Sequence, residues 1–232
     1  INDFVSGFTI LLKPNGVATF EFPHLLQLIH NTQFDTIYHE HFSYLSLTAV
    51  NYIFDNNGLQ IFDVEELSTH GGSLRVYAQR KDTENHLKMH SVNEMLNKEL
   101  ITGIKNINYY DDFQEKANKV KDDLLQFLIE AKRSNKRVMA YGAAAKGNTL
   151  LNYAGIRPDL LPTVVDLNPN KQNKYMPGSH IPIVNESDLK KCQPDYILIL
   201  PWNLRDEVQK QLSYISEWGG QFVTAVPCLE IL

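Results

Sequence analysis

The spacing of apolar residues predicts alternating helices and strands in the first third of the chain. Apolar side chains within 4–12 recur at the interval that places them on one face of a helix. The run 17–22 is rich in β-formers and stops at Pro23, which predicts a buried strand. Two further helices are expected at 24–29 and 48–57, and two further strands at 59–64 and 74–80. The short loop between the last two strands predicts an antiparallel pair.

The centre of the chain is expected to be helical from 81 to about 135. Apolar residues between Phe113 and Leu128 lie on one face of a long amphipathic segment whose remaining positions are rich in charge. This segment predicts a helix that links two domains. We place the domain boundary near residue 85.

The last part of the chain repeats a strand and helix rhythm. Strands are expected at 137–141, 161–166, 196–200 and 221–226, and helices at 143–152, 187–191 and 204–218. Such alternation predicts a parallel sheet flanked by helices, which is a Rossmann-like unit. The fold class expected from the whole pattern is therefore α/β.

Composition and charge exclude several classes of protein. The 232 residues are 43% hydrophobic and 21% charged, as in ordinary soluble globular proteins. The net charge of −5 and the dispersed basic residues predict no binding to nucleic acid or to a membrane surface. No apolar run is long enough to span a membrane and the first residues lack a secretory signal, so we expect a cytoplasmic protein. Nothing in the sequence predicts an oligomeric state.

Two features concern the limits and the redox chemistry of the chain. It begins without Met on an apolar helical pattern, so we expect it to start inside a domain. Cys192 and Cys228 form no Cys-x-x-Cys pair, so we expect neither a disulfide framework nor a cysteine zinc site.

The segment 34–44 carries the first candidate chemistry. It places Glu40 between His39 and His41. Histidine titrates closest to neutral pH, and a neighbouring glutamate can raise its basicity or fix its tautomer, so the segment predicts an acid/base cluster. The alternative is that these side chains hydrogen-bond the backbone in a buried turn. A metal site is less well supported, because the two histidines are two positions apart and not the four of a helical zinc motif.

A second candidate is the run of small residues within 138–149, where a strand is expected to pass into a helix. Small side chains let a phosphate approach the N–H groups of a helix N-terminus, and Lys146 would add a positive charge. The alternative is tight packing of the helix on the sheet. Asp166 ends the next expected strand, where an acidic residue can bind a ribose, but a turn aspartate is equally compatible.

Two smaller segments complete the candidates. His70 opens a loop with two glycines and a serine, and offers one titratable side chain. Trp202 and Asn203 follow a strand at its carboxyl end, where ligands bind in open α/β sheets. A core or interface role for Trp202 is the alternative to stacking on a ligand.

At four segments the chain resembles the sugar C-methyltransferases of deoxysugar biosynthesis. The segments are DTIYHEHFSY at 35–44, HGGSLR at 70–75, YGAAAKGNTLLN at 141–152 and LPWNL at 200–204. In that family an N-terminal zinc-binding domain with cysteine ligands precedes a class I methyltransferase domain and a Rossmann-like C-terminal domain. The resemblance implies that 1–85 is the C-terminal half of the methyltransferase domain. It also implies that 86–232 contains linker helices and the Rossmann-like domain that binds a nucleotide sugar.

The resemblance further implies an enzyme that methylates the carbon beside the ketone of a nucleoside-diphosphate keto-deoxysugar. The methyl donor is S-adenosylmethionine, and a base must first remove a proton from that carbon. His41 matches the family's catalytic base, Glu40 is expected to orient it and contact the sugar, and Tyr38 to hydrogen-bond the enolate oxygen. The residues expected to bind the substrate are Tyr44, His70, Gly142, Lys146, Asn148, Trp202 and Asn203.

The family's zinc cysteines and its acidic, glycine-rich donor loop have no counterpart in this sequence. We therefore expect no zinc here, an incomplete donor site with no assignable donor-binding residues, and an inactive segment when it is isolated. Two other functions remain open. The chain can be an NAD(P)-dependent oxidoreductase with Asp166 on the ribose, or a non-catalytic module that binds a nucleotide sugar.

Overall fold

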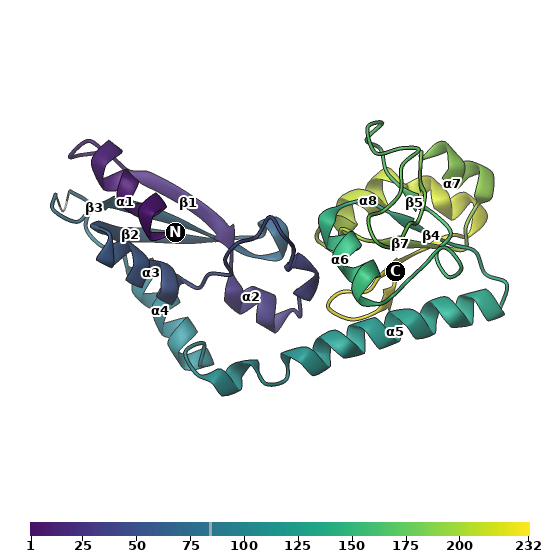
Figure 1. Cartoon of the computed structure of the whole chain (residues 1–232), viewed down its shortest axis with the longest axis horizontal. Coiled ribbons are helices and arrows are strands. Elements are labelled where there is room, and N and C mark those ends of the chain that lie inside the picture. The colour runs from purple at the N-terminus through teal and green to yellow at the C-terminus, as the bar shows by residue number, and fades with distance from the viewer. Residues whose placement is uncertain (84) are drawn as a thin grey trace. The chain divides into compact units, whose positions relative to one another are not determined.

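A computed structural model describes residues 1–83 and 85–232, and the chain divides into two compact units (Figure 1). Unit 1 comprises Ile1–His30 and Phe42–Asp112, and unit 2 comprises Asn31–His41 and Phe113–Leu232. The division therefore falls at residue 112 and not near residue 85. Helix α4 (His90–Thr102) belongs to unit 1 because Val92 and Met95 are buried in its core.

Unit 1 is built on a three-stranded antiparallel sheet. Its strands are β1 (Ala18–Pro23), β2 (Leu59–Leu67) and β3 (Ser73–Arg80), in the order β1-β3-β2. Its other helices are α1 (Asn2–Leu11), α2 (Leu25–His30) and α3 (Leu47–Asn56). The expected antiparallel pairing of β2 with β3 is confirmed. The expectation that β1 is a buried strand is wrong, because β1 is an edge strand whose alternate side chains face solvent.

A buried carboxylate holds the start of α3. Oε1 and Oε2 of Glu99 accept hydrogen bonds from the backbone N–H groups of Leu47 and Thr48, at 2.6 and 2.7 Å. Oε1 also lies 2.7 Å from Nε2 of buried His24. Burial disfavours the charged carboxylate, yet these hydrogen bonds outweigh it and hold the pKa of Glu99 below its usual value. Glu99 thus ties α4 to the N-terminus of α3.

Unit 2 is a Rossmann-like unit, as expected. Its six-stranded sheet has the order β6-β5-β4-β7-β8-β9, and every pairing is parallel except that of β8 with β9. The strands are β4 (Val138–Tyr141), β5 (Val164–Val165), β6 (Ile183–Val184), β7 (Tyr196–Ile199), β8 (Gln221–Thr224) and β9 (Glu230–Ile231). The α/β fold class is therefore confirmed.

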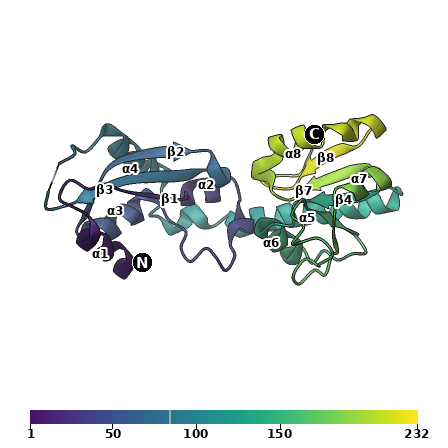
Figure 2. The same cartoon turned by 90° about the horizontal axis from the view of Figure 1, so that it is seen from above.

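Helices cover both faces of this sheet (Figure 2). Successive side chains of β4 alternate: Val138 and Ala140 pack with α5 (Phe113–Arg133) and α6 (Ala145–Tyr153), and Met139 and Tyr141 face the other side. There they pack with α7 (Ser187–Cys192) and α8 (Arg205–Gln211). The apolar face expected between Phe113 and Leu128 is the buried face of α5.

Several element bounds differ from expectation. The helical region 81–135 is divided into α4, a short 3-10 helix and α5, and the expected helix 204–218 into α8 and a 3-10 helix at Ser213–Trp218. Strand β5 spans two residues, and β6 and β9 were not expected. Two-residue strands carry too little periodicity to be recognised in a sequence. Among the described residues, no helix has the length and apolar character needed to cross a membrane.

Candidate functional site

Residues 34–41 of the segment with the predicted acid/base cluster belong to unit 2, and residues 42–44 belong to unit 1. The part in unit 2 contains a 3-10 helix, η1 (Phe34–Thr36), whose three residues are all buried. The ring of Phe34 joins the core formed by α5, α6 and the sheet, with its centroid 5.0 Å from that of Tyr153 on α6. The apolar anchor at Phe34 therefore fixes the start of the segment on the Rossmann-like unit.

The backbone of the segment sets the tautomer of His41. Nδ1 of His41 lies 2.8 Å from the carbonyl oxygen of Thr36. A carbonyl can only accept, so Nδ1 carries the proton and Nε2 is the ring nitrogen with a lone pair in neutral histidine. The ring of Tyr38 lies against that of His41, with centroids 4.3 Å apart. The half-buried imidazole is thus held in the tautomer in which Nε2 carries the lone pair.

Glu40 does not make the expected contact with His41. Its Oε1 lies 3.9 Å from Nε2 of His39, and both of these side chains are largely exposed. The Thr36 carbonyl accepts a hydrogen bond from the His41 ring, because the tight turn after η1 brings that oxygen to it. A contact of Glu40 with the sugar stays a prediction.

Two glycines bring the start of α6 against the turn after β7. Gly142 has a φ of +93°, and a Cβ at this position would lie 2.5 Å from Cδ of Pro201. A Cβ on Gly147 would lie 2.6 Å from Cβ of Leu200. Tight packing therefore accounts for both glycines, and it places the 141–152 segment directly beside the 200–204 segment.

A buried polar network joins three of the four segments that carry the family resemblance. Nε1 of Trp202 donates a hydrogen bond to Oδ2 of Asp35 at 2.7 Å. Nζ of Lys146 donates to Oδ1 of Asn203 at 2.9 Å and lies 4.3 Å from the centroid of the Trp202 ring. Asp35 and Lys146 are 0% and 8% exposed. The N–H and the ring of Trp202 therefore both contact other residues of unit 2, which favours a core role for this side chain over stacking on a ligand.

Burial shifts the ionisation of both charged groups in this network. Burial raises the pKa of Asp35 to about 6, against the opposing effects of the Trp202 hydrogen bond and the Lys146 charge. Burial likewise lowers the pKa of Lys146, which Asp35 partly counteracts. With its ammonium directed at Asn203 and Trp202, Lys146 is an internal group. The geometry does not favour its expected role as a cradle for a diphosphate.

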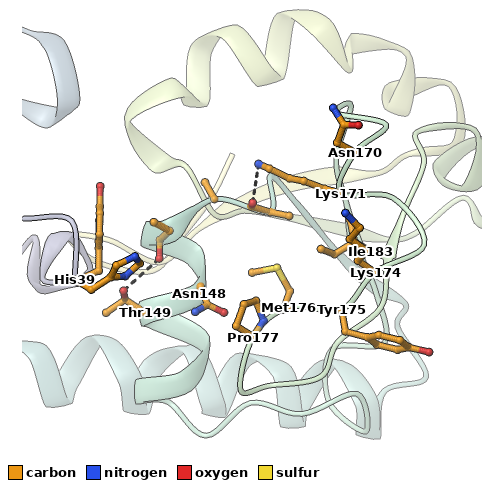
Figure 3. Close-up of a pocket in the computed structure, with 14 residues that line it drawn as sticks. His39, Asn148, Thr149, Asn170, Lys171, Lys174, Tyr175, Met176, Pro177 and Ile183 are labelled. Atoms are coloured by element: carbon orange, nitrogen blue, oxygen red, sulfur yellow. Dashed lines mark hydrogen bonds between the residues drawn. The ribbon is translucent and has the colours of Figure 1, made fainter.

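A cavity of about 370 Å³ in unit 2 adjoins the start of α6 (Figure 3). Tyr38 and His39 line it from the stretch that follows η1, and Asn148 and Thr149 from α6. Asn170, Lys171, Lys174, Tyr175, Met176 and Pro177 line it from the loop after β5. In Figure 3, His39 and Lys174 lie on different sides of the hollow. The cavity lies where α/β sheets bind ligands, beyond the carboxyl ends of β4 and β5.

Polar atoms face this region from several directions. Oδ1 of Asn148 is buried with no hydrogen-bond partner among the described residues. The N-cap residue of α6, Ala144, offers no side chain to the first N–H groups of the helix. Lys174 is exposed, whereas Nζ of Lys171 donates to the carbonyl of Ala143 at 2.8 Å. The cavity thus combines positive charge with a helix N-terminus.

Asp166 is engaged by the protein itself. Oδ2 accepts from the N–H of Ala143 at 2.8 Å, and Nζ of Lys171 lies 3.4 Å from the same oxygen. Oδ1 accepts from the N–H of Asn168 at 2.8 Å. Both oxygens therefore stabilise the turns beside β4 and β5. This arrangement favours the turn role over a contact with the ribose of NAD.

The remaining predicted site residues divide between the two units. Tyr44 and His70 belong to unit 1, where His70 has a φ of +56° in a short 3-10 helix (Thr69–Gly71). Gly72 follows with a φ of +119°, and a Cβ there would lie 2.7 Å from Cγ of Gln27. Unit 2 brings the others together: Tyr38, Glu40, His41, Gly142, Lys146, Asn148, Trp202 and Asn203.

Three residues of the site carry no signal of their own in the sequence. Nothing in the sequence shows that Asp35 is buried beside Trp202. Lys171 and Lys174 stand in a polar loop whose lysines carry no distinguishing pattern. The position of that loop directly after a strand was the usable signal. Within the described residues, no three His, Cys, Asp or Glu side chains gather as a metal site would require.

Comparison with known proteins places the chain in a family. Residues 68–227 match the family model of the C-methyltransferase C-terminal domain. The chain is 34% identical over 227 residues to the C-methyltransferase NovU of Streptomyces niveus, an alignment that covers 98% of this chain. The chain spans about half the length of that relative, because the alignment covers 54% of it. The chain therefore belongs to the C-methyltransferase family and contains its C-terminal domain.

Proposed function

We propose that the chain is the C-terminal portion of an S-adenosylmethionine-dependent methyltransferase. Its substrate is a nucleoside-diphosphate keto-deoxysugar, methylated at the carbon beside the ketone. One observation carries this proposal: the segment with His41 and the start of α6 share one compact unit, and Tyr38 and His39 line a cavity with α6. The proposed base and the proposed nucleotide-binding helix therefore belong to the same unit, which supports the proposal.

His41 is the base in this proposal. The proton on the carbon beside a ketone is weakly acidic, and a base removes it as charge develops on the ketone oxygen. Nε2 of His41 takes up that proton, since Nδ1 is already protonated toward the Thr36 carbonyl. Tyr38 lies against the His41 ring, and its hydroxyl is the donor proposed for the enolate oxygen.

The cavity beside α6 holds the nucleotide part of the substrate in this proposal. A diphosphate accepts hydrogen bonds from N–H groups and is attracted by cations. The first turn of α6 supplies the N–H groups, and Lys171 and Lys174 supply positive charge from the loop after β5. The buried Oδ1 of Asn148 is an acceptor available to an N–H of a base or to a hydroxyl.

The methyl donor completes the reaction. S-adenosylmethionine would supply a methyl group on a sulfonium. The deprotonated substrate carbon would attack that methyl group in line as the methyl–sulfur bond breaks, with S-adenosylhomocysteine as the leaving group. The donor loop of the family has no counterpart in this sequence, so we propose that the 232 residues alone do not transfer methyl groups. We also propose that zinc binds outside these residues and that the enzyme is cytoplasmic.

A calorimetric titration of the 232-residue chain tests the nucleotide site. Thymidine diphosphate is expected to bind, and S-adenosylmethionine, titrated in parallel, is not. Lys174→Gln should weaken the binding of thymidine diphosphate by about tenfold or more through the loss of a hydrogen bond to a charged group. Lys116→Gln, which alters an exposed lysine on α5, is the matched control and should bind like the unaltered chain. Absence of thymidine diphosphate binding, or binding of NAD in its place, would contradict the proposal.

A further inference from the structure

Trp202 and His41 are connected by a short path of hydrogen bonds and backbone. Nε1 of Trp202 donates to Oδ2 of Asp35 at 2.7 Å. Asp35 is the middle residue of η1, and the next residue, Thr36, accepts a hydrogen bond from Nδ1 of His41 at 2.8 Å. The indole after β7 is thus joined to the imidazole through two residues, Asp35 and Thr36.

We propose that Asp35 and Trp202 are positioning residues: through η1 they hold the Thr36 carbonyl where it keeps His41 in the Nδ1–H tautomer. The inference rests on the proposed role of His41 as a base, because only this tautomer presents the lone pair of Nε2. A base in the wrong tautomer would offer an N–H to the carbon-bound proton, and no transfer would follow.

The 3-10 helix η1 is restrained at its first residue, Phe34, and at its middle residue, Asp35, which makes it a stiff support. Phe34 is buried against Tyr153 on one side of Asp35. Asp35 is hydrogen-bonded to Trp202. The Trp202 ring is in turn fixed, because Nζ of Lys146 lies over it and it packs on the core of unit 2. Because the indole cannot move with Asp35, a displacement of Asp35 would shift the Thr36 carbonyl.

The buried carboxylate of Asp35 lowers the stability of unit 2, and packing alone does not explain its presence in η1. Asp35 is completely buried, and its Oδ1 has no hydrogen-bond partner among the described residues. A buried charge with one unsatisfied oxygen lowers stability compared with an apolar side chain of similar size. Costly polar groups of this kind are characteristic of functional sites.

Long-range proton–nitrogen NMR of the imidazoles of the 232-residue chain measures the tautomer directly. His41→Gln assigns the signal. The unaltered chain is expected to show His41 as the Nδ1–H tautomer, and Trp202→Phe, which keeps a ring but removes the donor, should convert it to a mixture. Trp218→Phe is the matched control, because Nε1 of Trp218 donates to the carbonyl of Pro194, away from this path. That control should retain the tautomer.

Two substitutions of Asp35 extend the test should Trp202→Phe fail to fold. Asp35→Leu removes the acceptor and should mix the tautomers, whereas Asp35→Asn retains an acceptor for the indole and should preserve Nδ1–H. Retention of the pure tautomer in Trp202→Phe or in Asp35→Leu would overturn the inference. Loss of the tautomer in the Trp218→Phe control would also overturn it, because the effect would then be general loosening.

The inference and the proposed function fail separately in this design. The tautomer is measured without substrate or donor, so it reports the support of His41 whether or not the enzyme methylates a sugar. In the full-length enzyme, Trp202→Phe should lower kcat on the order of 10- to 100-fold through misplacement of the base, with KM little changed. An unchanged kcat together with mixed tautomers would show that the support exists and that His41 is not the base.

Discussion

Nε1 of Trp202 lies 2.7 Å from Oδ2 of Asp35, although 167 residues separate them in the sequence. This contact binds the turn after β7 to the segment that carries His41. The segment therefore belongs with the Rossmann-like sheet of unit 2, although its neighbours on both sides in the sequence belong to unit 1.

Asp35 should make the stability of unit 2 depend on pH. Its folded pKa of about 6 lies above the usual 3.8, so its contribution to stability is complete below about pH 4 and is lost as the pH rises through 6. The shift corresponds to about 3 kcal/mol. Relative to the unaltered chain, Asp35→Asn should therefore gain up to about 3 kcal/mol between pH 3.5 and pH 8.

Tryptophan fluorescence during urea unfolding measures this gain in unit 2 alone. The chain has two tryptophans, Trp202 and Trp218, and both lie in unit 2. Asp195→Asn is the matched control, because its carboxylate is bonded at the surface to Lys136 and its pKa is lowered, mainly by that bond. Relative to the unaltered chain, Asp195→Asn should therefore lose stability, and not gain it, as the pH rises. A difference between Asp35→Asn and the unaltered chain that stays constant with pH would contradict the prediction.

Gly142→Ala should destabilise unit 2 strongly. The positive φ is unfavourable for alanine, and the added Cβ would meet the ring of Pro201, so we expect a loss of about 2 to 5 kcal/mol. Gly155→Ala isolates the backbone effect, since Gly155 has a φ of +66° with nothing within 4 Å of the added Cβ. It should cost about 1 to 2 kcal/mol. Equal urea midpoints for the two variants would show that the Pro201 contact is unimportant.

The sequence predicted the sheet of unit 2 well, because β4, β7 and β8 are buried apolar runs with clear bounds. The weak points were short elements and long-range contacts. Strand β5 pairs over only Val164 and Val165, and its flanking residues follow no period. No local pattern distinguishes Asn31–His41 from its neighbours in the sequence. Its membership of unit 2 follows from the position of Phe34 in the core of that unit, which only the structure shows.

Lys146→Met should alter the buried network and leave nucleotide affinity unchanged. Methionine keeps the unbranched stem and removes the charge that lowers the pKa of Asp35, so that pKa should rise further. Calorimetry should give a thymidine diphosphate affinity within about twofold of the unaltered chain, in contrast to Lys174→Gln. A large loss of affinity in Lys146→Met, with the fold intact, would return Lys146 to the diphosphate site.

The sequence indicates which residues can carry chemistry, but not which atoms they contact. The histidine cluster was visible because His39, Glu40 and His41 are adjacent, but adjacency predicted the wrong partner for His41. The partner is the Thr36 carbonyl, and backbone atoms leave no mark in a sequence. Lys146 was likewise visible as a cation beside small residues, and its burial against Trp202 and Asn203 depends on the pairing of β4 with β7.

Glu99→Gln should loosen the start of α3 in unit 1. The folded pKa of Glu99 is lowered, so its contribution is present above about pH 4.5 and is lost as the pH falls through the folded pKa. At neutral pH the amide would lose one of the three accepted hydrogen bonds, at a cost of about 1 to 3 kcal/mol. Hydrogen exchange of Leu47–Asn56 should accelerate accordingly. Glu94→Gln, on the exposed face of α4, should leave it unchanged.

The most direct test of the proposed function is exchange of the substrate proton beside the ketone in deuterated water. Proton NMR monitors this exchange in a mixture of the full-length enzyme and a thymidine-linked keto-deoxysugar, without methyl donor. We predict that the enzyme exchanges this proton and that His41→Gln abolishes the exchange, while His90→Gln, which alters an exposed histidine of α4 outside the cavity, retains it. Exchange that persists at the original rate in His41→Gln would contradict the assignment of His41 as the base.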